Sequence, residues 1–273
     1  MLDIAIEAAQ EAGRVLMERL NEPREIRIKG ERDIVTDADL AAQEAIIRTI
    51  KSHYPEHDIL SEESTQKLEG HSDHCWIIDP LDGTTNYSRR YPCFSVSIAA
   101  SFKGEVVLGV VYDPLRDQLF TAQRGEGAYL NEKRIEVSER GSCGQALIGL
   151  DWAHRSRERA EVIQLVKAIA PLARTLRTCG SAVLALCYVA SGRLDAYFNT
   201  ALKPWDGAAG SLIVREAGGK VTDLAGHPWR LDSPRCLASN GLIHEQLLSI
   251  LGNRRRGFCP PGENLVQWGW DVI

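Results

Sequence analysis

The sequence lacks any apolar run near the ~18 residues that a bilayer span needs, and its N-terminus has no basic start followed by an unbroken apolar core. Its seven cysteines are an odd number, lie far apart and include no C-x-x-C pair. We therefore expect no membrane association, no zinc-ribbon or disulfide framework, and a reducing cytoplasm as the compartment.

The chain also lacks a stripe of basic residues. Its 32 Lys and Arg are outnumbered by 37 Asp and Glu, for a formal net charge of -5, and the basic run Arg254 to Arg256 is short. Binding to a nucleic-acid backbone requires a positive surface, so we do not expect a nucleic-acid partner. There is no internal repeat and no Pro/Gly/Ser-rich linker, which favours two closely packed lobes.

The composition is that of an ordinary globular protein, with 44% hydrophobic and 25% charged residues. Helical spacing of apolar residues predicts amphipathic helices over 2 to 20 and 37 to 52. Short buried or alternating segments, separated by turn signals, then predict an antiparallel sheet behind those helices. These segments are 75 to 79, 94 to 101, 105 to 113 and 117 to 124.

From about residue 145 the pattern changes to strands alternating with helices, which is typical of an α/β arrangement. Helices are expected at 156 to 169, 206 to 217 and 242 to 251, with an apolar segment at 181 to 192 and a strand near 194 to 199. The sequence thus predicts a mixed α/β (α+β) protein with an N-terminal lobe, 1–145, and a C-terminal lobe, 146–273.

The clearest motif follows an apolar strand and is Asp79-Pro80-Leu81-Asp82-Gly83-Thr84-Thr85-Asn86. Pro80 disfavours the α conformation at Asp79 and ends the strand, which puts Asp82 in the following turn. The two carboxylates and the carbonyl of Leu81 can then converge on one point. Hard divalent cations require such oxygen ligands.

Gly83 lets the backbone approach a ligand closely, and Thr84 can cap a helix whose free N–H groups would accept a phosphate. A polar turn in which the aspartates act only as caps explains the same string equally well. Elsewhere, Glu62 beside Glu63 is typical of a solvated surface, and Asp206 alone is most simply a helix N-cap.

These motifs together resemble the inositol monophosphatase family. The resemblance is carried by Asp79 to Asn86, by Trp205 to Gly210 and by Glu216 to Gly219. It extends through Lys29, Asp33 to Asp39, Ser61 to Ser64, Gly125 to Ile135 and Gly180 to Gly192, and covers roughly residues 1 to 250. It implies a layered αβαβα sandwich of the sugar phosphatase type, a homodimer, and lithium-sensitive hydrolysis of a small phosphorylated polyol, inositol 1-phosphate first.

The resemblance also implies a magnesium cofactor, with two or three ions in each site. The matching metal ligands are Glu62, Asp79, the carbonyl of Leu81, Asp82 and Asp206. Crowded carboxylates repel one another unless cations neutralise them, which agrees with that assignment.

Activation of the nucleophilic water is implied for Glu62, Thr84 and Asp39, and backbone contacts to the phosphate for Gly83 and Thr84. Contacts to the rest of the substrate are implied at Gly180, Ser181 and Ala182, and Lys29 matches a mobile loop over the site. Asp195 is expected to have a structural or substrate-facing role. None of the seven histidines falls within these motifs, and His71 with His74 is interpreted as a solvated pair.

Two positions leave the substrate open. Asn199 stands where inositol-selective relatives usually carry Glu, and Lys203 is a candidate contact for a second phosphate or a carboxylate. Fructose 1,6-bisphosphate, histidinol phosphate and 3′-phosphoadenosine nucleotides are the alternative substrates. A regulatory or RNA-associated binding protein is the alternative outside catalysis. For the tail 257 to 273, rich in Pro, Gly and Trp, we expect packing on the body or on a subunit interface.

Overall fold

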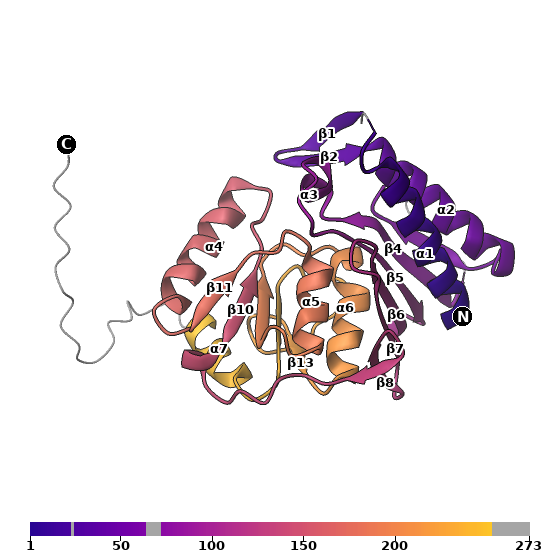
Figure 1. Cartoon of the computed structure of the whole chain (residues 1–273). Coiled ribbons are helices and arrows are strands. Elements are labelled where there is room, and N and C mark those ends of the chain that lie inside the picture. The colour runs from indigo at the N-terminus through magenta and orange to yellow at the C-terminus, as the bar shows by residue number, and fades with distance from the viewer. Residues whose placement is uncertain (23–24, 64–71, 253–273) are drawn as a thin grey trace, which may run out of the picture.

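The computed structural model describes residues 1–22, 25–63 and 72–252. Its first layer is a pair of helices, α1 (Leu2–Arg19) and α2 (Asp37–His53), which cover one face of a large sheet (Figure 1). Alanines such as Ala8 and Ala42 are fully buried, so the two helices pack closely. Thr36 is the N-cap of α2, and Asp39 completes a capping box with it. Both predicted helices are confirmed.

The second layer is a seven-stranded sheet in the order β3-β4-β5-β6-β7-β8-β9. The predicted antiparallel pairing is confirmed from β4 to β9, whereas β3 pairs parallel to β4. The strands are β3 (Asp58–Ser61), β4 (His74–Asp82), β5 (Ser95–Phe102), β6 (Glu105–Asp113), β7 (Gln118–Gln123), β8 (Gly127–Leu130) and β9 (Lys133–Ile135).

The middle layer consists of α5 (Ala182–Ala190) and α6 (Pro204–Glu216), which lie between the two sheets (Figure 1). Nearly every residue of α5 is buried, since a helix covered on both sides needs no polar face. Small residues allow close approach: a Cβ on Gly210 would lie 2.7 Å from the side chain of Leu186.

The fourth layer is a five-stranded sheet in the order β11-β10-β12-β14-β13, and α4 (Ser156–Ile169) and α7 (His244–Gly252) cover its outer face. Strand β10 pairs parallel with β11 and β12, while β14 pairs antiparallel with β12 and β13. The strands are β10 (Leu147–Leu150), β11 (Thr175–Arg177), β12 (Ala196–Asn199), β13 (Lys220–Thr222) and β14 (Cys236–Ser239). A short 3-10 turn, η1 (Cys143–Gln145), precedes β10.

Three hydrophobic clusters fill the spaces between these layers, so the αβαβα sandwich is confirmed. Among the elements that were not predicted, β1 (Ile26–Gly30) and β2 (Asp33–Thr36) form a separate antiparallel hairpin. No helix in the described part of the chain is long and apolar enough to cross a membrane. His71 and the tail 257 to 273 lie outside the described residues.

Candidate active site

The D-P-L-D-G-T motif lies at the end of β4, where the pairing with β5 shifts register between Asp79 and Asp82. Gly83 has φ +98° and precedes the short helix α3 (Thr84–Ser88). A Cβ on Gly83 would lie 3.0 Å from the carbonyl oxygen of Cys93 and 3.1 Å from that of Gly180. Only glycine fits this turn. Gly83, not Thr84, is therefore the N-cap, and Thr84 is the first residue of the helix.

Three carboxylates from distant parts of the sequence meet beside this turn. Oxygens of Glu62, Asp79 and Asp206 all lie within 4.8 Å of one another. Glu62 follows β3, Asp79 lies in β4, and Asp206 lies in the first turn of α6. The N-cap of α6 is Lys203, so the simple N-cap role considered for Asp206 is wrong; Asp206 accepts a hydrogen bond from the Lys203 N–H at 2.8 Å.

The electrostatics of this cluster are those of a cation site. Burial, and then the charges of Glu62, Asp82 and Asp206, raise the pKa of Asp79 well above its usual range. Burial, and then the charges of Glu62 and Asp82, raise the pKa of Asp206. Within the described residues, Asp79 accepts one hydrogen bond, from the Leu81 N–H at 3.0 Å. Several oxygens with few donors fit a hard divalent ion such as Mg²⁺.

Lys29 places its ammonium against this cluster. Its Nζ lies 2.8 Å from Oε1 of Glu62 and 2.7 Å from Oε1 of Glu63. Burial opposes the charge on Lys29, but the two glutamates outweigh burial and its pKa is raised. Burial raises the pKa of Glu63 to about 7. The lysine therefore supplies a positive charge at the edge of the acidic cluster.

Asp82 lies in the same cleft but faces the N-terminus of α5. Its carboxylate accepts hydrogen bonds from Oγ of Ser181 at 2.5 Å, from the Val183 N–H at 2.8 Å and from the Ala182 N–H at 3.3 Å. Burial raises its pKa to about 7 despite these donors. The structure thus joins Asp82, an expected metal ligand, to Ser181 and Ala182, two of the expected substrate contacts.

Thr84 and Asp39 are also brought together. Oγ1 of Thr84 lies 3.0 Å from Oδ1 of Asp39 and 3.1 Å from the carbonyl oxygen of Leu81. The other carboxylate oxygen accepts from the N–H and hydroxyl of Thr36 at 2.8 and 2.5 Å. Burial raises the pKa of Asp39 to about 6. This places a weak base behind the hydroxyl of Thr84.

Most of these residues open on one cleft of about 720 Å³ between the hairpin β1–β2, α3 and the loop after β10; Asp39, Glu63 and Ser181 are not among its lining residues. Several lining residues were not predicted from the sequence. They are Tyr91, Asp151, Trp152, His154 and Arg159. Asp151 and Trp152 directly follow β10, a strand with parallel neighbours on both sides, and the carboxyl end of such a strand commonly carries site residues. That signal was available in the sequence.

Asn199 and Lys203 both line this cleft. The side chain of Asn199 is already engaged: Oδ1 accepts from the Ala201 N–H at 2.9 Å, and Nδ2 donates to the hydroxyl of Tyr197 at 2.8 Å. That hydroxyl donates to Asp151 at 2.9 Å. Asn199 therefore belongs to a buried polar network at the wall of the cleft.

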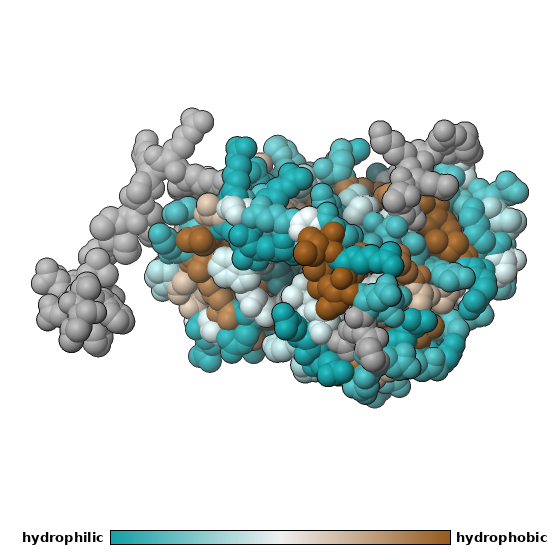
Figure 2. All heavy atoms as spheres, turned by 90° about the horizontal axis from the view of Figure 1, so that it is seen from above, coloured by the Kyte–Doolittle hydropathy of each residue, from teal (hydrophilic) through white to brown (hydrophobic). Residues whose placement is uncertain are grey.

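The hairpin β1–β2 closes one side of the cleft. Nη1 of Arg32 donates to the carbonyl of His154 at 2.8 Å, and Nδ1 of His154 donates back to the carbonyl of Arg32 at 2.6 Å. Ile26 and Ile28 of the hairpin stay exposed, at 51% and 82%. Figure 2 looks down on this side and shows hydrophobic side chains gathered near its centre. Polar contacts to His154 in the loop after β10, rather than a core of its own, hold the hairpin.

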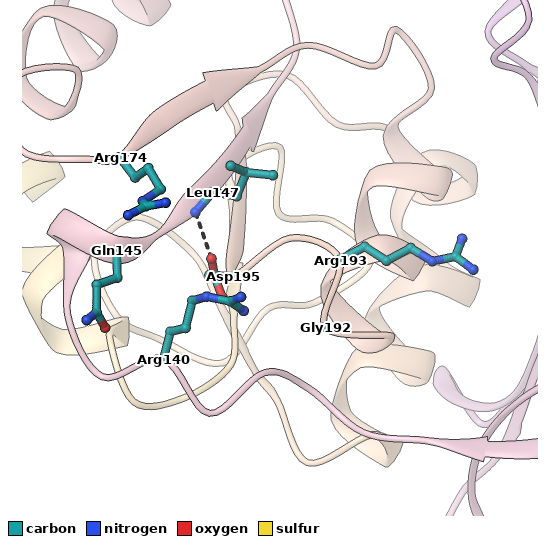
Figure 3. Close-up of a pocket in the computed structure, with 7 residues that line it drawn as sticks. All are labelled: Arg140, Gln145, Leu147, Arg174, Gly192, Arg193 and Asp195. Carbon is teal, nitrogen blue, oxygen red and sulfur yellow. Dashed lines mark hydrogen bonds and ion pairs between the residues drawn. The ribbon is translucent and has the colours of Figure 1, made fainter.

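Asp195 lies outside the cleft, in a second pocket of about 430 Å³ (Figure 3). Its carboxylate accepts from the Leu147 N–H at 2.7 Å and from the hydroxyl of Ser138 at 2.5 Å, and Arg140 lies 3.5 Å away. Figure 3 shows Arg140 beside Asp195, whereas Arg193 points away. Asp195, just before β12, joins the start of β10 to the loop that carries Ser138 and Arg140, which agrees with a structural role.

The fold is thus a five-layered α/β sandwich of the sugar phosphatase type, with an acidic cluster at a strand-to-helix turn. The family model for the inositol monophosphatase family matches residues 1–256. The chain therefore belongs to the inositol monophosphatase family.

Its relatives include Nus factor SuhB of Escherichia coli (strain K12), 44% identical over 253 residues, which are 91% of this chain and 94% of that one. Among solved structures, the extragenic suppressor protein suhB from Bartonella henselae matches with a TM-score of 0.89 and 36% identity, covering 92% of this chain and 98% of that chain. Inositol monophosphatase from Anabaena matches with a TM-score of 0.83 and 38% identity, covering 92% and 94%.

Proposed function

We propose that this chain is a Mg²⁺-dependent phosphomonoesterase that hydrolyses a small phosphorylated polyol or sugar, with inositol 1-phosphate as the first candidate. The observation that carries the proposal is the meeting of Glu62, Asp79 and Asp206 within 4.8 Å beside a turn that only glycine fits. Membership of the family and the likeness to the Anabaena inositol monophosphatase support the same activity.

The residues that would hold two or three Mg²⁺ ions are Glu62, Asp79, Asp82, Asp206 and the carbonyl of Leu81. Bound there, the metal would lower the pKa of a water molecule and stabilise the charge on the leaving alkoxide. Asp82 keeps its orientation through the donors of α5, so the start of that helix would support the metal site as well as the substrate.

Thr84 and Asp39 would hold the attacking water and take up its proton. The hydroxyl of Thr84 donates to Asp39, which leaves its own oxygen lone pairs free to accept a hydrogen bond from water. Asp39, with a pKa raised to about 6 by burial, would take a proton near neutral pH. Glu62 would act beside them as one of the residues that would hold the metal.

The phosphate would lie against the backbone N–H groups of Gly83 and Thr84, at the start of α3, where helical N–H groups lack internal partners. The alcohol portion would extend toward Ala182, Asn199 and Lys203 on the cleft wall. The side chain of Asn199 already forms hydrogen bonds with Tyr197 and Ala201. We therefore propose that it shapes the cleft wall and does not bind a ring hydroxyl of the substrate.

The test is phosphate release with Mg²⁺ from inositol 1-phosphate, fructose 1,6-bisphosphate, histidinol phosphate and 3′-phosphoadenosine 5′-phosphate. We expect preference for inositol 1-phosphate, inhibition by lithium, and loss of release in Asp82→Asn. No release from any substrate, by a protein that binds Mg²⁺, would contradict the proposal.

A second candidate follows from the names of the curated relatives. Proteins 40% and 44% identical to this chain, from Salmonella typhimurium and Escherichia coli, are named Nus factor, a name that points to a role in transcription complexes. Asp82→Asn separates the two functions. A transcription role that survives in this variant, while phosphate release is lost, would assign that role to a binding surface; the homodimer remains a prediction for either function.

A further inference from the structure

Two cysteines, Cys93 and Cys179, lie side by side next to the turn that contains Gly83. Cys93 is buried just before β5, and Cys179 is partly buried, precedes Gly180 and lines the active-site cleft. Each thiol is the largest influence on the pKa of the other, which places the two side chains next to each other. They are separated by 85 intervening residues of sequence, so the fold rather than chain proximity brings them together.

The backbones of the two cysteines are joined as well. Nδ2 of Asn86 donates to the carbonyl of Cys93 at 2.7 Å and to the carbonyl of Cys179 at 2.9 Å. Asn86 belongs to the same motif as the metal ligands. A change in the distance between these two segments would therefore displace Asn86 and, with it, the motif.

Gly83 fills the space between the same two segments. Any Cβ at Gly83 would lie 3.0 Å from the carbonyl oxygen of Cys93 and 3.1 Å from that of Gly180. The turn has no free room in which to adjust. If the segments moved toward each other, the backbone of Gly83 would have to shift.

We propose that Cys93 and Cys179 form a reversible disulfide on oxidation by a peroxide, and that this bond switches off the active site. Neither residue belongs to the metal or phosphate ligands of the proposed function, so the thiols are available for this second chemistry.

The chemistry needs one molecule of hydrogen peroxide. The sulfur of Cys179 attacks one peroxide oxygen, the O–O bond breaks, and the leaving hydroxide takes a proton to become water. The sulfur of Cys93 then attacks the resulting sulfenic acid, so that the S–S bond forms, the S–O bond breaks and a second water leaves. Two thiols are oxidised and one peroxide is reduced to two waters.

Exposure decides which thiol attacks first, because Cys179 lines the cleft and can meet a small oxidant, whereas Cys93 is buried. The pKa shifts agree in direction: the contact between the thiols lowers the pKa of Cys179 and, together with burial, raises that of Cys93. Cys93, behind it, is placed to resolve the sulfenic acid.

Loss of activity would follow because the disulfide shortens the distance between the sulfurs of Cys93 and Cys179. A disulfide holds its sulfurs at about 2.0 Å, closer than two thiols approach, so the segments carrying Cys93 and Gly180 are drawn together around Gly83. Displacements near 1 Å at a catalytic site cost up to about a hundredfold in rate. We expect phosphate release to fall about tenfold or more.

The experiment treats the full-length protein with hydrogen peroxide, blocks free thiols, and maps the disulfide by mass spectrometry of its peptides, with phosphate release measured in parallel. We expect a Cys93–Cys179 bond and an activity that dithiothreitol restores. Mapping does not require an active enzyme, so its result stands apart from the proposed function.

The variants Cys93→Ala and Cys179→Ala should lose the dithiothreitol-reversible part of the inactivation, each measured against its own reduced activity. Cys75→Ala, in β4 and away from the turn, and Cys259→Ala, outside the described residues, are the matched controls and should retain it. The proposal is overturned if the two thiols stay free after treatment, if both single variants remain reversibly inactivated, or if the mapped bond leaves activity unchanged.

Discussion

The tripeptide Asp-Pro-Leu occurs twice at strand ends of the seven-stranded sheet, as Asp79-Pro80-Leu81 in β4 and as Asp113-Pro114-Leu115 after β6. Both aspartates are buried, and in both the carboxylate accepts the N–H of the leucine at 3.0 Å. The turns share their local structure. They differ in what surrounds the carboxylate.

The fourth residue decides the difference. After Leu115 comes Arg116, whose Nη1 lies 2.8 Å from Asp113 and whose N–H donates to the same carboxylate at 3.2 Å. After Leu81 comes Asp82, which adds a second negative charge, and Glu62 and Asp206 add two more. One buried aspartate is neutralised within the protein, whereas the other has like charges around it and would need a cation from outside. In the proposed function, unbalanced charge rather than local turn structure therefore distinguishes the metal site.

The largest expected effect is on Asp79→Asn. Loss of a central ligand should lower Mg²⁺-dependent phosphate release by more than about a hundredfold. Mutation of a residue that only orients a metal ligand costs up to about a hundredfold, and loss of the ligand itself should cost more. Because one of several repelling charges is removed, the metal-free variant should also melt at a higher temperature than the wild type. Activity and calorimetry together check this. A metal-free variant that is less stable would show that Asp79 is a structural residue.

The matched change in the other turn is Asp113→Asn, with the opposite expected outcome. It weakens the contact of a buried carboxylate with Arg116 and should lower the free energy of unfolding by about 2 kcal/mol. Phosphate release per folded molecule should stay unchanged. Urea unfolding and activity at a temperature where the variant is folded measure both. A large loss of activity with unchanged stability would contradict the claim that Asp113, unlike Asp79, has only a structural role.

The sequence predicted those features that depend on nearby residues and missed those that depend on distant contacts. The helices α1 and α2 and the sheet followed from apolar periodicity, which depends on nearby residues. The hairpin β1–β2 did not, because every residue of β1 is exposed and polar contacts to His154 hold the hairpin. The Asp79 motif was found because Gly-Thr-Thr follows it.

The rest of the site required the fold. The pairing of Asp82 with Ser181 spans 99 positions, and the contact of Lys29 with Glu62 spans 33. Resemblance to a family named these residues but not their contacts. No local rule predicts that Asn86 would join Cys93 to Cys179.

The pH dependence of stability should reflect the uncompensated carboxylates. Burial raises the folded-state pKa of Asp39 and Asp151 to about 6 and of Asp82 and Glu63 to about 7, against usual values near ~4. The folded protein then binds more protons than the unfolded chain between these values, so stability falls as pH rises from about 4 to about 7.

We therefore expect the metal-free protein to melt at a lower temperature at pH 8 than at pH 5, and saturating Mg²⁺ to remove most of that difference. Melting curves at both pH values, with chelator or with Mg²⁺, measure this. A metal-free melting temperature that rises across the window would mean that the carboxylates are already compensated within the protein.

The smallest expected effect concerns Lys29. Its ammonium competes with a metal for Glu62, so Lys29→Ala should raise Mg²⁺ affinity, by up to about fivefold for a partly exposed ion pair worth about 1 kcal/mol. Arg27→Ala on the same strand, which removes only the exposed pair with Glu25, is the control. Isothermal titration with Mg²⁺ measures both. A lower affinity in Lys29→Ala would instead indicate that the lysine orients Glu62 for the metal.

The central claim, that the charge imbalance around Asp79 is a divalent metal site, is tested most directly by anomalous diffraction from crystals soaked in Mn²⁺ as a substitute for Mg²⁺. We expect a strong anomalous peak among Glu62, Asp79 and Asp206, and none beside Asp113. A structure at full Mn²⁺ occupancy elsewhere, with no peak among these three carboxylates, would contradict it.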